Sequence, residues 1–206
     1  MQLFWEKGYG STSVADVLQA ARVNSGSLYH FFPGKQDLLL AVLDMYHGGL
    51  RTMLLEPAWR GVTDPIERIF ALLARYRRSL ADTDCFYGCP IGSLALELHE
   101  PDQPVRERLA ANFAAWTDAI HQCLKDAGSR LPSDLDRREL AAFVLTAMEG
   151  GVMQARTFRD IGAHCTVEAV SCVPTLRPCC ARRGPGGPRA REPCTRRRSD
   201  HEPNDA

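Results

Sequence analysis

The 206-residue sequence lacks any apolar run close to the roughly 18 residues of a membrane-spanning helix. Its N-terminus also lacks the basic segment and following apolar segment that are typical of a signal peptide. Net charge is absent as well, since lysine plus arginine and aspartate plus glutamate both number 25. We therefore expect a cytoplasmic protein that has no membrane partner.

Residue groupings that would hold a metal or build a catalytic centre are also missing. Cys85 and Cys89 are separated by three residues instead of the two of a redox motif, and His99 has no second histidine at helical spacing. Cys123 and Cys165 stand in helix-like or loop sequence without zinc-type pairing. We therefore expect reduced thiols, no metal site, no cofactor and no enzymatic activity. The alternative role for the loop around His99 is contact with a small effector.

Strand patterns are scarce, whereas helical signals recur, so we expect an all-α fold. Asp64 is placed to cap a helix, Pro65 suits the first helical position, and Glu67 completes a reciprocal capping arrangement. A second, long amphipathic helix is predicted over residues 105–127, with Gly128 as its end. The two apolar stripes consist of Ile66, Ile69, Phe70, Leu73 and Leu80, and of Val105, Leu109, Phe113, Trp116, Ile120 and Leu124.

The segment over residues 137–155 is apolar on nearly all sides of a helix. One side can pack against its own domain, while the other side needs a partner. Glycines at positions 150 and 151 would allow a neighbouring helix to approach closely. We therefore predict a homodimer, and the alternative is the central helix of a monomeric bundle. The predicted dimer interface consists of Phe143, Ala147, Gly150, Gly151 and Gln154.

The N-terminal segment contains the pattern of two short helices joined by a tight turn. Gly8 and Gly10 interrupt the chain, and the serine and threonine residues at 11–13 are candidate caps for a helix of about two turns. After a turn near Arg22, a second short helix is predicted from about Ser25 to Phe31. This is the spacing of a helix-turn-helix motif.

The outward face of the second helix carries short hydrogen-bonding groups and an aromatic hydroxyl. Such a face suits the DNA major groove, where the first residues of a recognition helix meet base edges. Gly26 allows the backbone close to a phosphate, and Lys35 adds a charge at the start of the next helix. The alternative is that serine and glycine only mark a loop and that Tyr29, Phe31 and Phe32 are core aromatics.

These residues resemble the N-terminal domain of the tetracycline repressor (TetR) family. The resemblance implies a homodimeric repressor with an N-terminal three-helix helix-turn-helix domain over residues 1–46. A C-terminal helical bundle over residues 47–168 would bind a small effector and release DNA. The segment Tyr87 to Leu98 is similar to the ligand-binding half of one branch of the family. The matching N-terminal positions are Leu3, Phe4, Gly8, Tyr9, Thr12, Ser13, Val14, Val23, Gly26, Ser27, Leu28, Tyr29, Phe32, Lys35 and Leu38.

The expected partners are a double-stranded DNA operator, a small-molecule effector of unknown identity and a second copy of the chain. The charges before Met45 give little bulk attraction to DNA, so a dimer has to make directed contacts on a partly palindromic operator. The predicted DNA contacts are Thr12, Ser13, Asn24, Ser25, Gly26, Ser27, Tyr29, His30 and Lys35. The predicted effector-cavity residues are Phe113, Trp116 and Met148, with a filled core as the alternative.

Three features depart from the family pattern. The first helix is shorter, Arg22 replaces the usual turn glycine, and the last helix gives way to a tail at residues 169–206 that we expect to be basic and disordered. From Ser171 onward this tail has eight arginines against four acidic residues, and its composition also fits a shifted reading frame. The alternative function is therefore a truncated or frame-shifted helical protein that keeps effector binding but is impaired in dimerisation and DNA binding. A helical interaction module without a DNA target is the third class.

Overall fold

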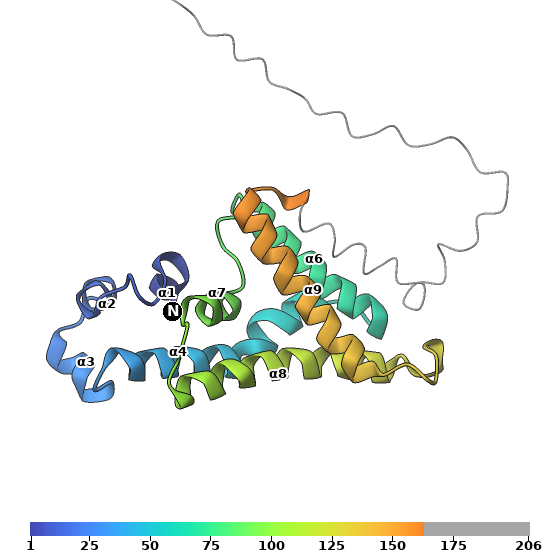
Figure 1. The fold of residues 1–206 in the computed structure, drawn as a ribbon, viewed down its shortest axis with the longest axis horizontal. Helices are drawn as coiled ribbons and strands as arrows, with labels where there is room; N and C mark the ends of the chain where they lie inside the picture. The colour runs from blue at the N-terminus through green and yellow to red at the C-terminus, as the bar shows by residue number, and fades with distance from the viewer. Residues whose placement is uncertain (163–206) are drawn as a thin grey trace, which may run out of the picture.

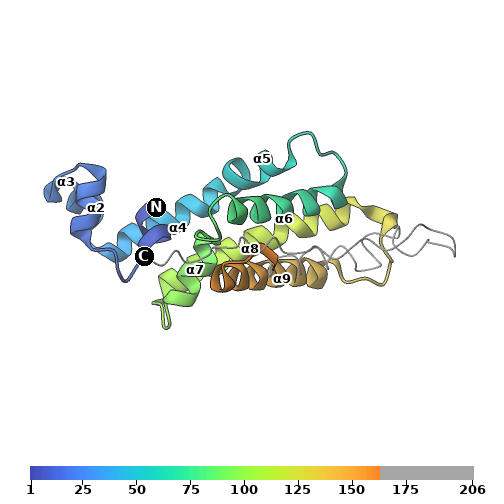
Figure 2. The same ribbon diagram turned by 90° about the horizontal axis from the view of Figure 1, so that it is seen from above.

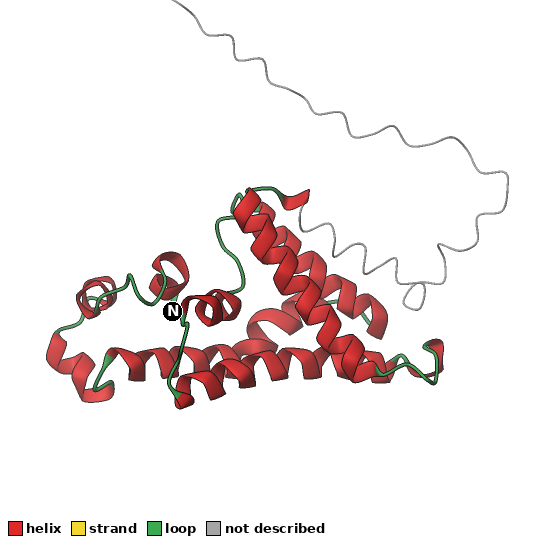
Figure 3. Ribbon diagram, viewed as in Figure 1, coloured by secondary structure: helices red, strands yellow, loops and turns green. Residues whose placement is uncertain are grey.

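The computed structural model describes residues 1–162, and every regular element in this part of the chain is helical, as Figure 3 shows. The predicted all-α class is confirmed. Cys165 and the predicted tail at residues 169–206 lie outside the described residues. The helices are α1 (Gln2–Lys7), α2 (Val14–Ala21), α3 (Ser25–Phe31), α4 (Lys35–Gly49), η1 (Leu50–Leu55), α5 (Glu56–Trp59), α6 (Pro65–Ala81), α7 (Pro90–Glu97), α8 (Gln103–Asp126), η2 (Gly128–Arg130) and α9 (Arg137–Phe158).

Side-chain caps define the two short helices of the helix-turn-helix. At the start of α2, Ser13 Oγ accepts a hydrogen bond from the Asp16 amide at 3.0 Å, and Asp16 Oδ2 accepts one from the Ser13 amide at 2.7 Å. At the start of α3, Asn24 Oδ1 accepts from the Ser27 amide at 2.8 Å. These bonds satisfy backbone donors that a helix start leaves free. The turn between α2 and α3 places Arg22 in the left-handed region at φ 55°, a conformation that glycine adopts more readily.

A small core holds this N-terminal part against the rest of the chain. Phe4 of α1 is buried with Leu39, Val42 and Leu43 of α4. Thr12 is fully buried, and its hydroxyl donates to the Gly8 carbonyl at 2.6 Å. Its predicted contact with DNA is therefore wrong, because the side chain bonds inside the domain and has no exposed surface.

The continuous helix Lys35–Trp59, made of α4, η1 and α5, is long and apolar enough to cross a membrane by length and composition alone. The core helix of a soluble protein meets the same criterion. Here α4 packs against α8, and Asn112 Nδ2 of α8 donates to the Leu43 carbonyl at 3.1 Å. The apolar side of α4 is thus part of the protein core.

The larger core lies between α6, α8 and α9, which Figure 1 and Figure 2 show packed side by side. The stripe predicted for residues 64–80 is mostly buried, because Ile66, Ile69, Leu73 and Leu80 face this core. Met148 of α9 is fully buried in the same cluster. The amphipathic patterns therefore identified the faces that hold the bundle together.

Asp64 caps α6 and connects it to the turn after α8. Its Oδ1 accepts from the Ile66 amide at 2.8 Å and from the Glu67 amide at 3.0 Å, as the capping pattern predicted for Asp64. The Arg130 guanidinium binds both carboxylate oxygens. The hydrogen bonds from Arg130 and from the α6 backbone together lower the pKa of Asp64 to about 2.

We predict that Asp64→Asn destabilises the protein at pH 7 and that this difference disappears in acid. The ionised carboxylate stabilises the fold above its ordinary pKa of 3.8, and this contribution is lost as the pH falls through about 2. Urea unfolding of both proteins between pH 7 and pH 2 measures the difference. On an Arg130→Met background the effect of Asp64→Asn should be smaller, and a pH-independent difference would contradict the assignment.

Candidate DNA-binding surface and effector cavity

The exposed face of α3 lies at one end of the molecule, away from α6 and α9, in both Figure 1 and Figure 2. Ser25, Gly26, Ser27, Tyr29 and His30 are all exposed there, and Tyr29 has half of its surface accessible at 50%. The structure therefore brings five of the predicted contact residues to one protruding surface.

Phe31 at the end of α3 was missed as a surface residue by the sequence analysis. Its side chain is 71% exposed and packs edge-on against His30, with ring centroids 4.9 Å apart. Val23, which precedes α3, is also well exposed. A period-based argument is weak for so short a helix, because a shift of one residue turns the buried face by about 100°.

Ser13, Asn24 and Lys35 all have partners inside the protein. Ser13 and Asn24 are exposed and cap α2 and α3. The Lys35 ammonium lies 4.2 Å from the centroid of the Tyr9 ring and 3.5 Å from the Gly10 carbonyl oxygen. The start of α4 has no side-chain cap at Gly34. Its first backbone amides are thus available to an anion.

A cavity of about 470 Å³ is lined by residues of α1, α4, η1, α6, α7, α8 and α9. Phe113 and Trp116 line it, together with Trp5, Tyr46 and Tyr76. Met148 does not, because it is fully buried in the α6–α8–α9 core. The prediction that Met148 lines the cavity is therefore wrong. The aromatic residues of α8 line the cavity instead.

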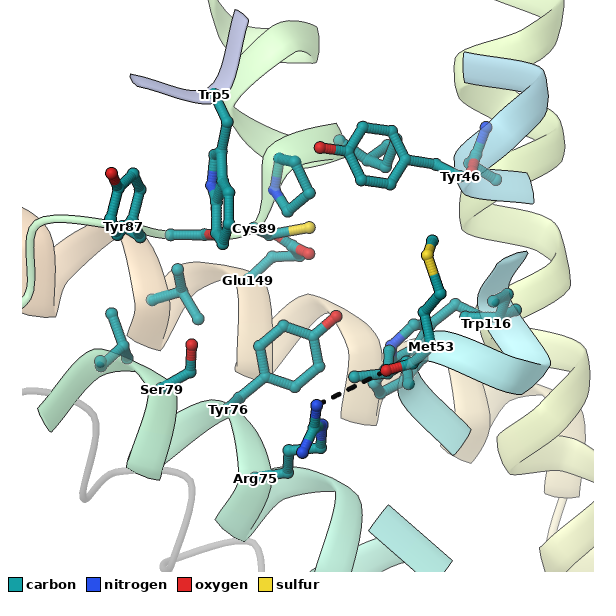
Figure 4. A pocket seen from close by; sticks show the side chains of 18 of the residues that line it. Trp5, Tyr46, Met53, Arg75, Tyr76, Ser79, Tyr87, Cys89, Trp116 and Glu149 are labelled. Carbon is teal, nitrogen blue, oxygen red and sulfur yellow. Dashed lines mark hydrogen bonds between the residues drawn. The ribbon is translucent and has the colours of Figure 1, made fainter. Parts of the chain in front are cut away.

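Arg75, Arg78 and Asp82 line the cavity but are exposed, whereas Cys89 is buried and Glu149 is partly buried. Figure 4 shows the Glu149 carboxyl beside the Cys89 thiol, between the rings of Trp5, Tyr46 and Tyr76. Burial raises the pKa of Glu149, raises that of Tyr46 to about 12, and raises that of the Cys89 thiol so that it stays protonated at neutral pH. A cavity with an apolar wall and a few directed polar groups is typical of a small-molecule site.

The first helix forms part of the wall of this cavity. Met1 and Trp5 line it, and the Trp5 Nε1–H donates to the Gly88 carbonyl at 2.9 Å. The rings of Trp5 and Tyr87 have centroids 4.5 Å apart, and the Tyr87 hydroxyl donates to Glu6 Oε1 at 2.8 Å. The helix-turn-helix domain and the cavity thus share residues.

Glu97 at the end of α7 forms a second link to the N-terminal domain. Its carboxylate accepts hydrogen bonds from the backbone amides of Tyr9, at 2.8 Å, and of Gly10. Gly8 has φ 83°, and a Cβ at this position would stand 2.8 Å from Glu97 Oε2. The close approach and the positive φ both require glycine. The sequence analysis missed Trp5, Glu6, Tyr87 and Glu97 because each contact joins positions that are far apart in the chain.

Helix α9 has two distinct faces. Val144, Met148, Val152 and Ala155 are buried in the bundle. On the opposite side Phe143 and Met153 are exposed by 52% and 49%, and Phe158 at the end of the helix is exposed by 68%.

Four of the five residues predicted at the dimer interface lie at least partly open to solvent, and they are Phe143, Ala147, Gly150 and Gln154. A Cβ added to Gly150 would meet no other atom within 4 Å. Gly151 is buried in its own chain. Its placement at a dimer surface is therefore wrong, because one residue along a helix turns the position by about 100°.

The cysteines of residues 1–162 lie in the interior of the protein. Cys85, Cys89 and Cys123 are free and buried. In this part of the chain no group of three or more histidine, cysteine, aspartate or glutamate side chains is placed to hold a metal. Thiols of this kind behave as small apolar side chains.

The helix-turn-helix joined to a helical bundle with an internal cavity defines the architecture of a one-component bacterial regulator. Residues 1–42 match the family described as bacterial regulatory proteins, tetR family, and residues 65–169 match the LmrA/YxaF-like transcriptional regulator C-terminal domain. The chain therefore belongs to the TetR family of transcriptional regulators, which bind DNA.

Relatives and solved structures agree with this assignment. The chain is 35% identical to the uncharacterized HTH-type transcriptional regulator Rv0196 of Mycobacterium tuberculosis over 164 residues, which is 77% of this chain and 81% of that protein. It is 27% identical to the HTH-type transcriptional repressor DhaR of Mycobacterium sp. over 162 residues, 77% of this chain and 79% of DhaR. A crystal structure of regulatory protein TetR from Rhodobacter sphaeroides superposes with a TM-score of 0.73 at 27% identity, covering 82% and 90% of the two chains.

Proposed function

We propose that this protein is a repressor that binds a partly palindromic operator as a homodimer and releases it when a small molecule occupies the cavity. The observation that carries the proposal is the shared wall, since Met1 and Trp5 of the first helix line the cavity of the C-terminal bundle. The relative DhaR is itself named a repressor.

Base reading by α3 is supported by its exposed polar surface. Ser25, Ser27 and His30 offer hydrogen-bonding side chains that suit base edges in the major groove. Tyr29, Lys35 and the uncapped start of α4 suit the phosphates on either side. Because the domain has no excess of basic residues, affinity depends on such directed contacts and on their duplication in a dimer.

The exposed apolar face of α9 supports dimerisation. Phe143 and Met153 form an exposed apolar stripe along about three turns of the helix, and a stripe of this kind is typical of a helix that packs against a partner. A second copy would cover it and would place two copies of α3 on successive half-sites of the operator.

Release follows from the links between α7 and the N-terminal domain. A ligand that displaces Trp5 would disturb its bond to Gly88, and through α1 it would move the segment that Glu97 holds at Tyr9 and Gly10. Lys35 contacts the same segment. Occupancy of the cavity would in this way change the position of the DNA-contacting surface.

We predict that Lys35→Ala weakens binding to operator and to random DNA alike and lowers the slope of log affinity against log salt by about one. Ser27→Ala should instead reduce operator affinity by about 1–3 kcal/mol with random DNA unchanged. Fluorescence anisotropy with labelled duplexes between 50 and 200 mM salt measures both, and the distant exposed Lys125→Ala is the matched control. Equal losses on every duplex for Ser27→Ala would exclude base reading by this residue.

Compounds that raise the melting temperature of the protein in a library screen should displace labelled operator. Trp5→Phe keeps an aromatic ring in the wall but removes the bond to Gly88. We expect the variant to bind each compound with near-normal affinity and to require a higher concentration for release. Calorimetry gives the affinity and anisotropy gives the release. Compounds that contact Trp5 quench its fluorescence, so their signal is lost in Trp5→Phe. The proposal is refuted if such compounds leave the operator bound at saturating concentration.

Phe143→Asp and Met153→Asp should raise the dimer dissociation constant by about 30-fold or more, the value for loss of a 2 kcal/mol interface residue. Operator affinity should fall with it, because a monomer contacts one half-site. Sedimentation velocity measures the association state. Leu96→Asp changes another exposed apolar residue, outside the α9 stripe, and should leave the dimer intact. A wild-type protein that is monomeric at micromolar concentration would disprove the dimer.

A further inference from the structure

The cavity contains an acidic group that has no charged partner among residues 1–162. Glu149 lines the cavity from α9 and takes part in none of the ion pairs of the described chain. Its polar neighbour is the Cys89 thiol, a neutral donor. A carboxylate removed from water without a counter-ion is unfavourable, so a cation brought in by a ligand would stabilise it.

The arginines around the cavity are engaged elsewhere or face solvent. Arg75 and Arg78 line the cavity but are exposed, and Arg75 Nη2 lies 3.5 Å from the Met53 carbonyl oxygen, as Figure 4 shows. Arg156, on the same helix as Glu149, donates to Ser93 Oγ at 3.0 Å and to the Phe86 carbonyl at 3.3 Å. None of them neutralises Glu149.

Aromatic rings surround the acidic group. Trp5 comes from α1, Tyr46 from α4 and Tyr76 from α6, and Figure 4 shows these three around Glu149, while Trp116 of α8 lines the cavity farther away. The faces of such rings attract cations, most strongly where water is excluded. Gly92 on α7 leaves room for the carboxyl, because a Cβ at this position would overlap the Glu149 side chain.

We propose that the cavity binds a monocationic aromatic or apolar molecule, with a quaternary or protonated amine at Glu149 and the apolar body against the surrounding rings. Glu149 is the carboxylate that lies among the aromatic rings and sets the charge, and the volume of about 470 Å³ admits a molecule of drug-like size. This inference rests on the proposed function only in identifying the ligand as the effector, because binding itself is measured without DNA.

The test compares three probes of similar shape and different charge by calorimetry on the full chain. They are (4-hydroxyphenyl)trimethylammonium, its neutral counterpart 4-tert-butylphenol, and the anion 4-hydroxybenzenesulfonate. The wild type should bind the cation about tenfold or more tightly than the neutral probe. Glu149→Gln should remove this preference with the neutral affinity unchanged, and Glu149→Asp should retain part of it. Asp134→Asn, which changes an exposed carboxylate outside the cavity lining, should leave it intact.

Equal or weaker binding of the cation, preference for the anion, or a cation preference that survives in Glu149→Gln would each overturn the proposal. Failure of the cation to bind at millimolar concentration would do so too. A thermal melt of each variant identifies loss of fold. If Glu149→Gln is unfolded, the cation preference of Glu149→Asp decides the test. Anisotropy with labelled operator is read separately. If the cation binds in a Glu149-dependent way but the operator stays bound, the release mechanism is refuted and the proposal that the cavity binds a cation stands.

Discussion

Contact between the first helix and the segment that precedes and includes α7 is the constraint on which the rest of the structure depends. Trp5 bonds to Gly88, Glu6 to Tyr87, and the Glu97 carboxylate to two successive backbone amides. These bonds close the cavity on one side and fix the helix-turn-helix on the other. This chain of hydrogen bonds links the wall of the cavity to the helix-turn-helix, and contiguous networks of this kind are a physical basis for the coupling proposed above.

The proposed DNA-contacting surface is held by local bonds more than by a core of its own. Both short helices begin at side-chain caps, and α3 contains no fully buried residue. Helices of this length are unstable alone. Their orientation therefore follows α1 and α4, whose buried residues Phe4, Leu39 and Leu43 belong to the core next to the cavity. A surface with little stability of its own is expected to move when α1 or α4 moves.

The side chains of helix α9 face three different surroundings. Met148 and Val144 fill the bundle core, Glu149 turns toward the cavity, and Phe143 and Met153 face outward. Because neighbouring residues on a helix point about 100° apart, successive positions serve different neighbours. This explains why Met148 was assigned to the cavity and Gly151 to the outer face, when each belongs to the core.

The sequence by itself determined the all-α class, the helix-turn-helix spacing, the Asp64 cap and the two-faced character of α9, because periodicity and capping are properties of nearby residues. It could not determine that Thr12 is buried, that Phe31 is exposed, or that Glu149 lies among aromatic rings. Only the tertiary structure decided these, since each depends on segments that meet across the fold. Trp5 and Gly88 are 83 positions apart in the chain, and no local pattern specifies a contact at that distance.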